Sequence, residues 1–333
     1  MLPALLLLTA AYLGYLVYEK RANDRYLASF RHVIHVNGIR GKTSVCRLLD
    51  AYLRGAGYRV FTKTTGTTPC CIDTSGQEHE IRRRGRVNIR EQLDMIRRAS
   101  REGAEVLILE CMAVRPELQR SSQELIVKGG VNVITNVRYD HVFEMGERLE
   151  DIAGSLAQTI PSGGALFTAD RDFFPFFQEK CREKGSQAFL CQAEAPAENE
   201  NEAIALAVGR YLGAPAEIFR DQVRLCRTDF GACRLYRTER GLFLNLFSAN
   251  DPQEDVVFLY NHRADRPDRL LLFLRHFFSQ RSGARIIVMG EHTGLAKKLL
   301  GRGGCRRVET ARGWRSALEA AGDAPVAGVG NIK

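Results

Sequence analysis

The stretch Val33-Ile-His-Val-Asn-Gly-Ile-Arg-Gly-Lys-Thr-Ser-Val-Cys46 joins a short β-branched run to a glycine-containing loop and the start of a helix. Gly38 and Gly41 let the backbone turn sharply and approach a ligand closely. The first N–H groups of a helix lack intrahelical acceptors, and the helix dipole adds about half a positive charge there. The stretch therefore predicts a phosphate-binding loop, in which Lys42 reaches the β/γ-phosphates and Thr43 offers a hydroxyl to Mg²⁺.

The glycine spacing of this loop is shorter than in the common Walker motif. The order is Gly-x-x-Gly-Lys-Thr, with two residues fewer between the glycines. An ordinary strand-to-helix turn has the same composition, so the flanking residues are needed to distinguish it from a phosphate-binding loop. Gly57 stands where a C-terminal cap belongs. Apolar residues repeat with the spacing of one buried helix face, namely Val45, Leu48, Leu49, Tyr52, Leu53 and Ala56.

Composition sets bounds on the fold and on the partners. The 333 residues, 45% of them apolar, are enough for two globular domains. A net charge of +9 favours polyanionic neighbours, which include nucleic acid, anionic lipids, nucleotides and poly-acid products, without choosing among them. Nine scattered cysteines without a C-x-x-C pair indicate reduced thiols rather than disulfides or a zinc site. We expect the adjacent pair Cys70-Cys71 in a solvated loop.

Residues 1–18 carry no charge and would form a helix about 27 Å long, which is enough to cross a hydrocarbon core. The basic residues follow the apolar run: Lys20, Arg21, Arg25 and Arg31. The positive-inside rule then places the following domain in the cytosol, behind a linker at 19–30. A cleaved signal peptide and a buried core helix are the alternatives, although a positively charged n-region is lacking.

Hydroxyl and basic side chains follow the second predicted strand, Arg59 to Thr62. Lys63, Thr64, Thr65 and Thr67 offer donors for phosphate or carboxylate oxygens, which makes them candidate substrate contacts; a solvated turn is the alternative. The densest positive run, Glu80 to Arg86, reads either as a solvated loop or as a funnel for an acidic polymer.

Two further strands end in residues that suit a metal site. The continuous apolar run from Glu105 ends in Glu110, and a carboxylate at the carboxyl edge of a parallel sheet is a Mg²⁺-ligand candidate. The strand Val131 to Thr135 leads to Asp140 and His141 at the same edge, so these residues are expected to converge near the phosphate loop. A structural hydrogen bond is the alternative for the Asp-His pair.

From Leu166 to Leu225 the sequence shows no motif with an evident chemical role. A second unit begins near Leu242 to Phe247. Strand and helix patterns then alternate, which predicts a small open parallel sheet. They are strands at Asp255–Tyr260, Arg285–Met289 and Val326–Val329, and helices at Asp268–Phe278 and Thr293–Leu300. Polar clusters at Asn250–Pro252 and Asn261–Arg269 lie at strand ends. The density of charges in the second cluster favours nucleotide or carboxylate contacts, and a solvated helix start with Asp268 as N-cap is the alternative.

Several motifs, taken together and in order, resemble the ligase subunit of bacterial poly-γ-glutamate synthase, which acts in capsule biosynthesis and is itself similar to the Mur ligases and folylpolyglutamate synthases. They are Asn37 to Thr43, Lys63 to Thr67, Glu110 to Val114, Asp140-His141, Ala249 to Asp251, Arg263 to Arg266 and Gly328 to Ile332. The resemblance covers the whole chain, including the apolar segment.

The resemblance implies an ATP- and Mg²⁺-dependent carboxylate–amine ligase that polymerises glutamate through an acyl phosphate. Lys42, Glu110 and His141 would be the catalytic residues, and Thr43, Glu110 and His141 would ligate metal. The ATP-binding residues would be Asn37, Gly38, Arg40, Gly41, Lys42, Thr43, Ser44, Asn261, Arg263, Asp265 and Arg266. Partners would be glutamate, the poly-γ-glutamate chain, small membrane subunits and a second copy of the chain, but not nucleic acid.

The fold that this implies is α/β: a P-loop, Mur-ligase-like ATPase domain at 31–235 and a smaller Rossmann-like α/β domain at 236–333, behind a transmembrane anchor in the bacterial cell membrane. Two departures limit the transfer. The segment Asp151–Ala157 lacks the modified lysine of many Mur ligases, so their second-metal arrangement is not carried over. Relatives of this family also continue past Lys333. The alternatives are a Mur- or folate-type ligase with a defined small product, and a membrane-tethered P-loop NTPase.

Overall fold

The computed structural model divides the chain into two compact units. Unit 1 comprises residues 1–138 and 144–227, and unit 2 comprises residues 139–143 and 228–333. The structure describes residues 2–66, 69–83, 85, 88–226, 234–238, 241–245, 257–265, 267–276, 285–305, 307–321 and 326–329. The domain boundary expected at residue 235 stays a prediction.

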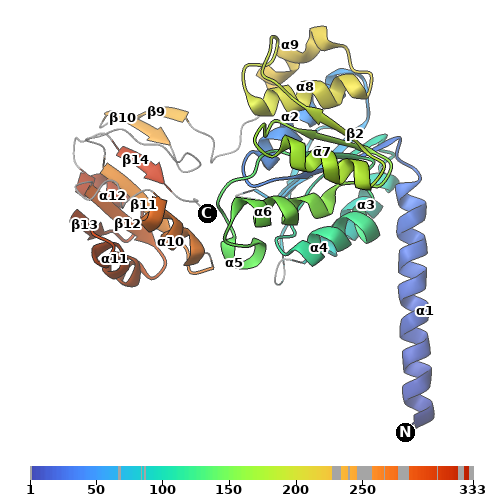
Figure 1. Ribbon diagram of the computed structural model, residues 1–333, viewed down its shortest axis with the longest axis horizontal. Helices are drawn as coiled ribbons and strands as arrows, with labels where there is room; N and C mark the ends of the chain where they lie inside the picture. Colours follow the sequence, from blue (N-terminus) through green and yellow to red (C-terminus); the bar gives the residue numbers. More distant parts are fainter. Residues whose placement is uncertain are drawn as a thin grey trace. The chain divides into compact units, whose positions relative to one another are not determined.

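Unit 1 is built on a sheet with helices packed around it (Figure 1). The sheet has eight strands in the order β4-β3-β2-β5-β1-β6-β7-β8. Strands β2, β5, β1, β6, β7 and β8 are parallel, whereas β3 and β4 are antiparallel. The strands are β1 (His32–Asn37), β2 (Val60–Thr64), β3 (Cys70–Ile72), β4 (Glu78–Glu80), β5 (Val106–Glu110), β6 (Val131–Ile134), β7 (Ala165–Thr168) and β8 (Gln187–Leu190).

Helices cover both faces of this sheet. One cluster of buried side chains packs α2, α8 and α9 on one face of the sheet. On the opposite face, a second cluster packs α3 and the π-helical turn η1. A third cluster packs α6 and α7 on that same face. The helices are α1 (Leu2–Leu27), α2 (Lys42–Gly55), α3 (Glu91–Arg101), α4 (Pro116–Ser121), η1 (Ser122–Val127), α5 (Val142–Met145), α6 (Leu149–Leu156), η2 (Ala157–Thr159), α7 (Phe174–Glu183), α8 (Glu200–Tyr211), η3 (Ala216–Ile218) and α9 (Phe219–Leu225).

Unit 2 holds a six-stranded sheet with the order β13-β12-β11-β14-β10-β9. Its strands are β9 (Arg234–Thr238), β10 (Gly241–Asn245), β11 (Val257–His262), β12 (Arg285–Gly290), β13 (Arg307–Thr310) and β14 (Val326–Val329). Its helices are α10 (Pro267–His276), α11 (Thr293–Arg302) and α12 (Trp314–Ala321). The expected parallel sheet is correct except at one edge, where β9 pairs with β10 in antiparallel fashion.

Helix α1 is long and apolar enough to cross a membrane by length and composition. It continues to Leu27, so most of the segment expected as a linker is helical. The last turns pack on unit 1: Asn23 is buried, and its Nδ2 donates to the Ile126 carbonyl at 2.8 Å. The large apolar side chains nearer the N-terminus, from Leu2 to Tyr18, are mostly exposed. Helix α1 is therefore joined to the sheet domain only by its C-terminal end.

The expectation for Cys70 and Cys71 was wrong. Both lie in β3, with 3% and 1% of their surface exposed. The misplacement arose because β3 is only three residues long and carries no repeat of apolar spacing. The described cysteines form no disulfide, and burial raises the pKa of the Cys70 thiol to about 11.

Candidate active site

The phosphate-binding loop has a backbone that requires both of its glycines. Gly38 has φ 123° and Gly41 has φ 83°, in the region that side chains rarely adopt. A Cβ on Gly38 would lie 2.0 Å from Thr135 Oγ1 and 2.7 Å from the Thr135 backbone nitrogen. A Cβ on Gly41 would lie 2.5 Å from Asn201 Oδ1. Close packing on two sides therefore holds the loop in one conformation.

Residues directly after strand β6 hold this loop by hydrogen bonds. The Arg40 backbone N–H donates to Asn136 Oδ1 at 3.0 Å, and the Arg40 carbonyl accepts from Thr135 Oγ1 at 2.6 Å and from Asn136 Nδ2 at 3.2 Å. These contacts are made by the backbone N–H and carbonyl of Arg40. Arg40 belongs to the predicted phosphate-binding loop, whereas the contacts of Thr135 and Asn136 with it were not predicted.

Lys42 opens helix α2 directly after the loop. Its Nζ donates to the carbonyls of Gly38 at 2.7 Å and Ile39 at 3.2 Å, which holds the ammonium group over the loop. Thr43 and Ser44 follow in the first turn, both half-buried. The loop thus presents a cation, two hydroxyls and the N-terminus of a 14-residue helix together, which suits a phosphate chain.

Glu110 ends the neighbouring strand β5 and lies against the start of α2. Its Oε2 accepts from Thr43 Oγ1 at 2.9 Å and from the Thr65 backbone N–H at 2.7 Å. Only 2% of the Glu110 surface is exposed. A carboxylate oxygen beside a hydroxyl oxygen is the kind of ligand set that Mg²⁺ prefers. The structure therefore brings Thr43, Glu110 and Thr65 together next to the phosphate-binding loop.

The size of this ligand set also fits Mg²⁺. Within the described ranges, no group of three or more His, Cys, Asp or Glu side chains is placed to hold a metal ion. Mg²⁺ usually takes one or two protein ligands and completes its shell with water and substrate phosphates. The pair Thr43 and Glu110 beside a phosphate-binding loop meets that requirement.

Lys63 and Thr64 are both buried, and their contact with a substrate stays a prediction. Lys63 is 0% exposed, and its Nζ lies 2.9 Å from Glu91 Oε1, while Thr64 Oγ1 lies 3.1 Å from Cys70 Sγ. Burial lowers the pKa of the Lys63 ammonium group, although the Glu91 carboxylate opposes this change. The tertiary pairing with Glu91 was not visible in the sequence. Thr65 is half-buried, and Thr67 lies outside the described residues.

Glu91 also binds Arg83, whose Nε donates to Glu91 Oε2 at 2.7 Å. Burial opposes ionisation of Glu91, yet its contacts with Arg83 and Lys63 hold its pKa below the ordinary value. One residue of the basic run 80–86 is thus fixed at the N-terminus of α3, beside the strand that carries Lys63.

Asn37 turns away from the phosphate-binding loop into the core. It is 2% exposed, and its Nδ2 donates to Gln119 Oε1 at 2.7 Å and Thr159 Oγ1 at 3.3 Å. Gln119 in turn donates to Ser155 Oγ at 2.9 Å. The structure therefore places the Asn37 side chain under the loop as a support. The position of Asn37 directly before the glycine loop could not show whether its side chain points toward the loop or into the core.

Asp140 and His141 belong to unit 2. Arg269 Nη2 lies 3.0 Å from Asp140 Oδ2, and Asp140 Oδ1 accepts the His141 backbone N–H at 2.9 Å. His141 has φ 51°, a left-handed conformation that is uncommon outside glycine. The pairing of Asp140 with Arg269 was not predicted, and convergence of His141 with the phosphate-binding loop stays a prediction.

The polar cluster after β11 is only partly described. Arg263 Nε donates to Asp265 Oδ1 at 2.8 Å, and the Ala264 N–H donates to Glu291 Oε2 at 2.9 Å. Asn261 lies half-buried near the carboxyl end of β11. Arg266 and the cluster Asn250–Pro252 lie outside the described residues. Asp268 is 3% exposed, so it does not start α10 as a solvated cap.

Asn201 is a site residue that sequence reasoning missed, because Ala193 to Asn201 reads as a polar loop. Asn201 instead lies in the first turn of α8, and its amide group borders Gly41. The available signal was the cap of this helix: Asn199 Oδ1 accepts the Glu202 N–H at 3.0 Å, and an Asn followed by Glu three residues later marks a helix start.

Two family models match most of the chain. A family model described as the Mur ligase middle domain matches residues 36–213, and one described as the poly-gamma-glutamate synthase CapB C-terminal domain matches residues 232–333. The chain is 31% identical over 310 residues to PGA synthase CapB of Bacillus subtilis, which covers 83% of this chain and 79% of the relative. The chain belongs to the CapB family. The resemblance stated from the motifs is thereby confirmed.

A second CapB relative and several solved structures extend the comparison. Capsule biosynthesis protein CapB of Bacillus anthracis is 32% identical over 313 residues, or 84% of this chain and 67% of that protein. A folylpolyglutamate synthase/dihydrofolate synthase from Yersinia pestis, solved with AMPPNP and Mn, superposes with a TM-score of 0.67 at 16% identity over 97% of this chain and 94% of that chain. MurF from Acinetobacter baumannii superposes with a TM-score of 0.64 at 13% identity, over 94% of this chain and 74% of that chain. The Mur-ligase-like α/β fold expected for this CapB chain is confirmed.

Proposed function

We propose that this CapB-family protein is an ATP-dependent amide ligase that polymerises glutamate into poly-γ-glutamate. The observation that carries the proposal is the contact of Glu110 with Thr43 and Thr65 beside the Lys42 loop. A phosphate-binding loop with a metal-ligand pair supports phosphoryl transfer, and family membership supports a glutamate carboxylate as the acceptor.

The reaction proceeds in two steps. The terminal carboxylate of the glutamate chain takes the γ-phosphoryl group of ATP, which releases ADP and leaves an acyl phosphate. The amine of the incoming glutamate then attacks the acyl carbon, the C–O bond to phosphate breaks, and the amine loses a proton. Lys42 neutralises charge on the β/γ-phosphates, and the α2 N-terminus orients them.

Thr43 and Glu110 would hold Mg²⁺, which supplies charge neutralisation on the transferring phosphoryl group. His141 is proposed as a further metal ligand and catalytic residue. Asn261, Arg263, Asp265 and Arg266 are proposed to contact ATP from the domain 236–333. Lys63, Thr64, Thr65 and Thr67 are proposed to contact the substrate, and Lys63 and Thr64 are buried in this structure. The 31–235 segment would then form the ATP-binding domain.

The proposed location is the bacterial cell membrane, with α1 as a single anchor and the catalytic units in the cytosol. The length and apolar composition of α1 support this location, as does the kinship with capsule-synthesis proteins. Small membrane subunits and self-association are proposed partners, because an anionic polymer made in the cytosol needs a route across the bilayer.

A single substitution tests the role of the loop. Lys42→Ala removes the cation over the phosphates, and we expect glutamate-dependent release of ADP and phosphate to fall at least about a hundredfold. Lys180→Ala, at an exposed pair with Glu183 on α7, is the matched control and should keep full turnover. Unchanged turnover in Lys42→Ala would refute the proposal. ATP hydrolysis that is indifferent to glutamate would favour an NTPase instead.

A further inference from the structure

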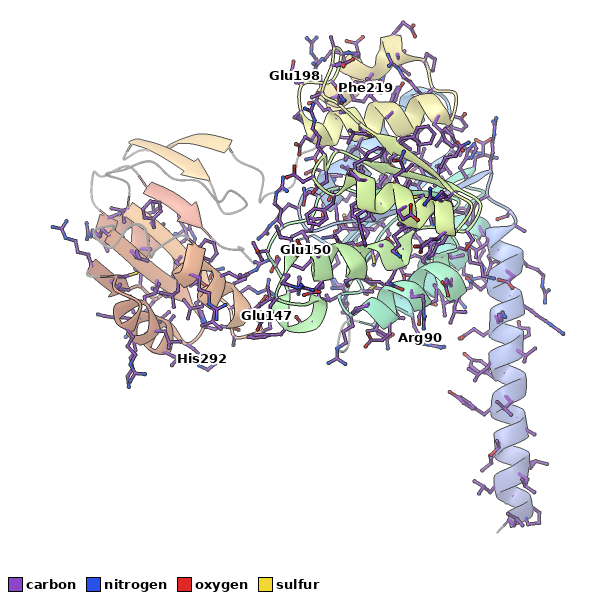
Figure 2. The ribbon with its side chains drawn as sticks, in the orientation of Figure 1. Arg90, Glu147, Glu150, Glu198, Phe219 and His292 are labelled. Carbon is purple, nitrogen blue, oxygen red and sulfur yellow. The ribbon has the colours of Figure 1, made fainter. Side chains whose placement is uncertain are left out.

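Helices α1 and α3 lie side by side within unit 1 and run in the same direction. Arg90, directly before α3, pairs with Glu19, and Ser100 near the end of α3 hydrogen-bonds with Ser29 at 2.9 Å (Figure 2 shows Arg90 on the side of unit 1 next to α1). The N-terminus of α3 therefore lies level with Glu19, which is the first charged residue after the apolar run.

This level corresponds to the bilayer surface, and this step rests on the proposed membrane anchor. Residues 2–18 cover about 25 Å as a helix, close to a hydrocarbon thickness of about 30 Å. The headgroup layer adds about 6 Å on each side, which places Glu19 and the following turn within it. Arg90 and the N-terminus of α3 then lie at the headgroups as well.

The cations near this level fall into two groups. Most are neutralised by carboxylates, in the pairs Arg83–Glu91, Arg90–Glu19, Arg97–Asp94, Arg98–Glu102 and Lys128–Asp24. The other group is exposed and, in the described part of the chain, has no carboxylate within ion-pair distance. Lys20, Arg21, Arg25 and Arg82 belong to this group.

The position of Arg82 is fixed by its neighbours. The Ile81 N–H donates to the Pro69 carbonyl at 2.8 Å, and the Ile81 side chain packs in the cluster that contains Leu27 of α1. On its other side, Arg83 binds Glu91, the first residue of α3. Arg82 is thereby held beside the α3 N-terminus without using its own guanidinium.

We propose that Lys20, Arg21, Arg25 and Arg82 form a surface that binds the anionic phospholipid headgroups of the cytosolic leaflet. Charge complementarity carries the choice of partner, because a basic surface next to an apolar span meets headgroups before any other anion. Gln92, two residues after Arg90, donates its Nε2 to the Glu110 carbonyl at 3.0 Å. The metal-site strand is thus held close to the bilayer, where a polymer bound for export is needed.

The test measures lipid selectivity of the full-length chain in vesicles of phosphatidylcholine with phosphatidylglycerol. Spin-labelled analogues of the two lipids report which one associates with the protein. We expect phosphatidylglycerol to associate about fivefold more strongly, and the triple variant Lys20→Gln/Arg21→Gln/Arg82→Gln to bring the ratio close to one. Raising the salt from 0.1 to about 1 M shortens the screening length to about 3 Å and should do the same without any substitution.

The matched control is Arg148→Gln/Lys180→Gln/Arg182→Gln, which removes three cations that pair with carboxylates three residues away. It should keep the selectivity. Selectivity that persists in the first variant overturns the proposal, as does a first variant that loses only the binding of a synthetic glutamate oligomer, since the surface would then serve the polymer. A chain that does not enter vesicles refutes the anchor and this surface together. Normal ADP release without lipid selectivity refutes the surface and leaves the ligase proposal standing.

Discussion

At the scale of single residues, charged side chains at the same edge of the sheet have different surroundings. Glu110 and Lys63 both follow apolar runs near the carboxyl edge of the sheet, and the sequence marked both as site residues. Glu110 meets Thr43, whereas Lys63 is buried against Glu91, 28 residues further along the chain. Such a pairing depends on tertiary packing, so residue type and spacing could not predict that Lys63 is buried against Glu91, whereas the role of Glu110 as a metal ligand stays a prediction.

His35 gives a pH-dependent prediction. It is fully buried in β1, its Nδ1 lies 2.9 Å from Gln123 Oε1, and burial lowers its pKa to about 4. Below pH 6.5 the His35 imidazole is protonated in the unfolded chain, whereas in the folded chain it becomes protonated only near pH 4. Stability is therefore fully present above pH 6.5 and is lost as the pH falls toward 4, by about 3 kcal/mol.

Urea unfolding followed at pH 7, 5.5 and 4.5 measures this loss. The variant His35→Gln removes the titrating group, so its stability should decline less steeply over the same range, whatever its absolute value. Equal slopes for the two proteins would show that His35 does not titrate in this way.

At the scale of elements, the strongly periodic segments were predictable and the short ones were not. The expected helix face from Val45 to Leu53 is buried in α2, and Gly57 follows its end with φ 91°. Strands β3 and β4 are three residues each, too short for a period to show. The supports of the phosphate-binding loop, Thr135 and Asn201, come from other elements, which spacing within the loop cannot reveal.

The loop gives a prediction at this scale. Gly38→Ala forces a side chain into a left-handed position and against the Thr135 backbone, so the loop must shift. We expect a loss of about 2 kcal/mol in stability and a large loss of ATP affinity. Gly57→Ala is the control, because its φ is 91° while nothing lies within 4 Å of the added Cβ.

The control should lose about 1 kcal/mol through backbone strain and keep its affinity for ATP. Calorimetric titration with a non-hydrolysable ATP analogue, together with urea unfolding, separates the two effects. Equal ATP affinity in both variants would mean that the conformation of Gly38 does not matter for binding.

At the scale of the whole molecule, the chain combines an apolar helix, a unit with a phosphate-binding loop and a second α/β unit. Alternating strand and helix patterns predicted both sheets and their class, since each pattern is local in sequence. The antiparallel edge strand β9 was not predicted, because it precedes the first clear strand signal of unit 2. The prediction of the function rested on several motifs that occur in order along the chain, and the family to which the chain belongs agrees with that prediction.

The central claim is that this protein joins glutamate into a polymer. The most direct measurement incubates membranes that contain the full-length chain with labelled glutamate, ATP and Mg²⁺, and sizes the labelled product. We expect a polydisperse anionic polymer that is absent when Lys42→Ala replaces the native chain. A single small product, or ATP turnover without incorporation of glutamate, would contradict it.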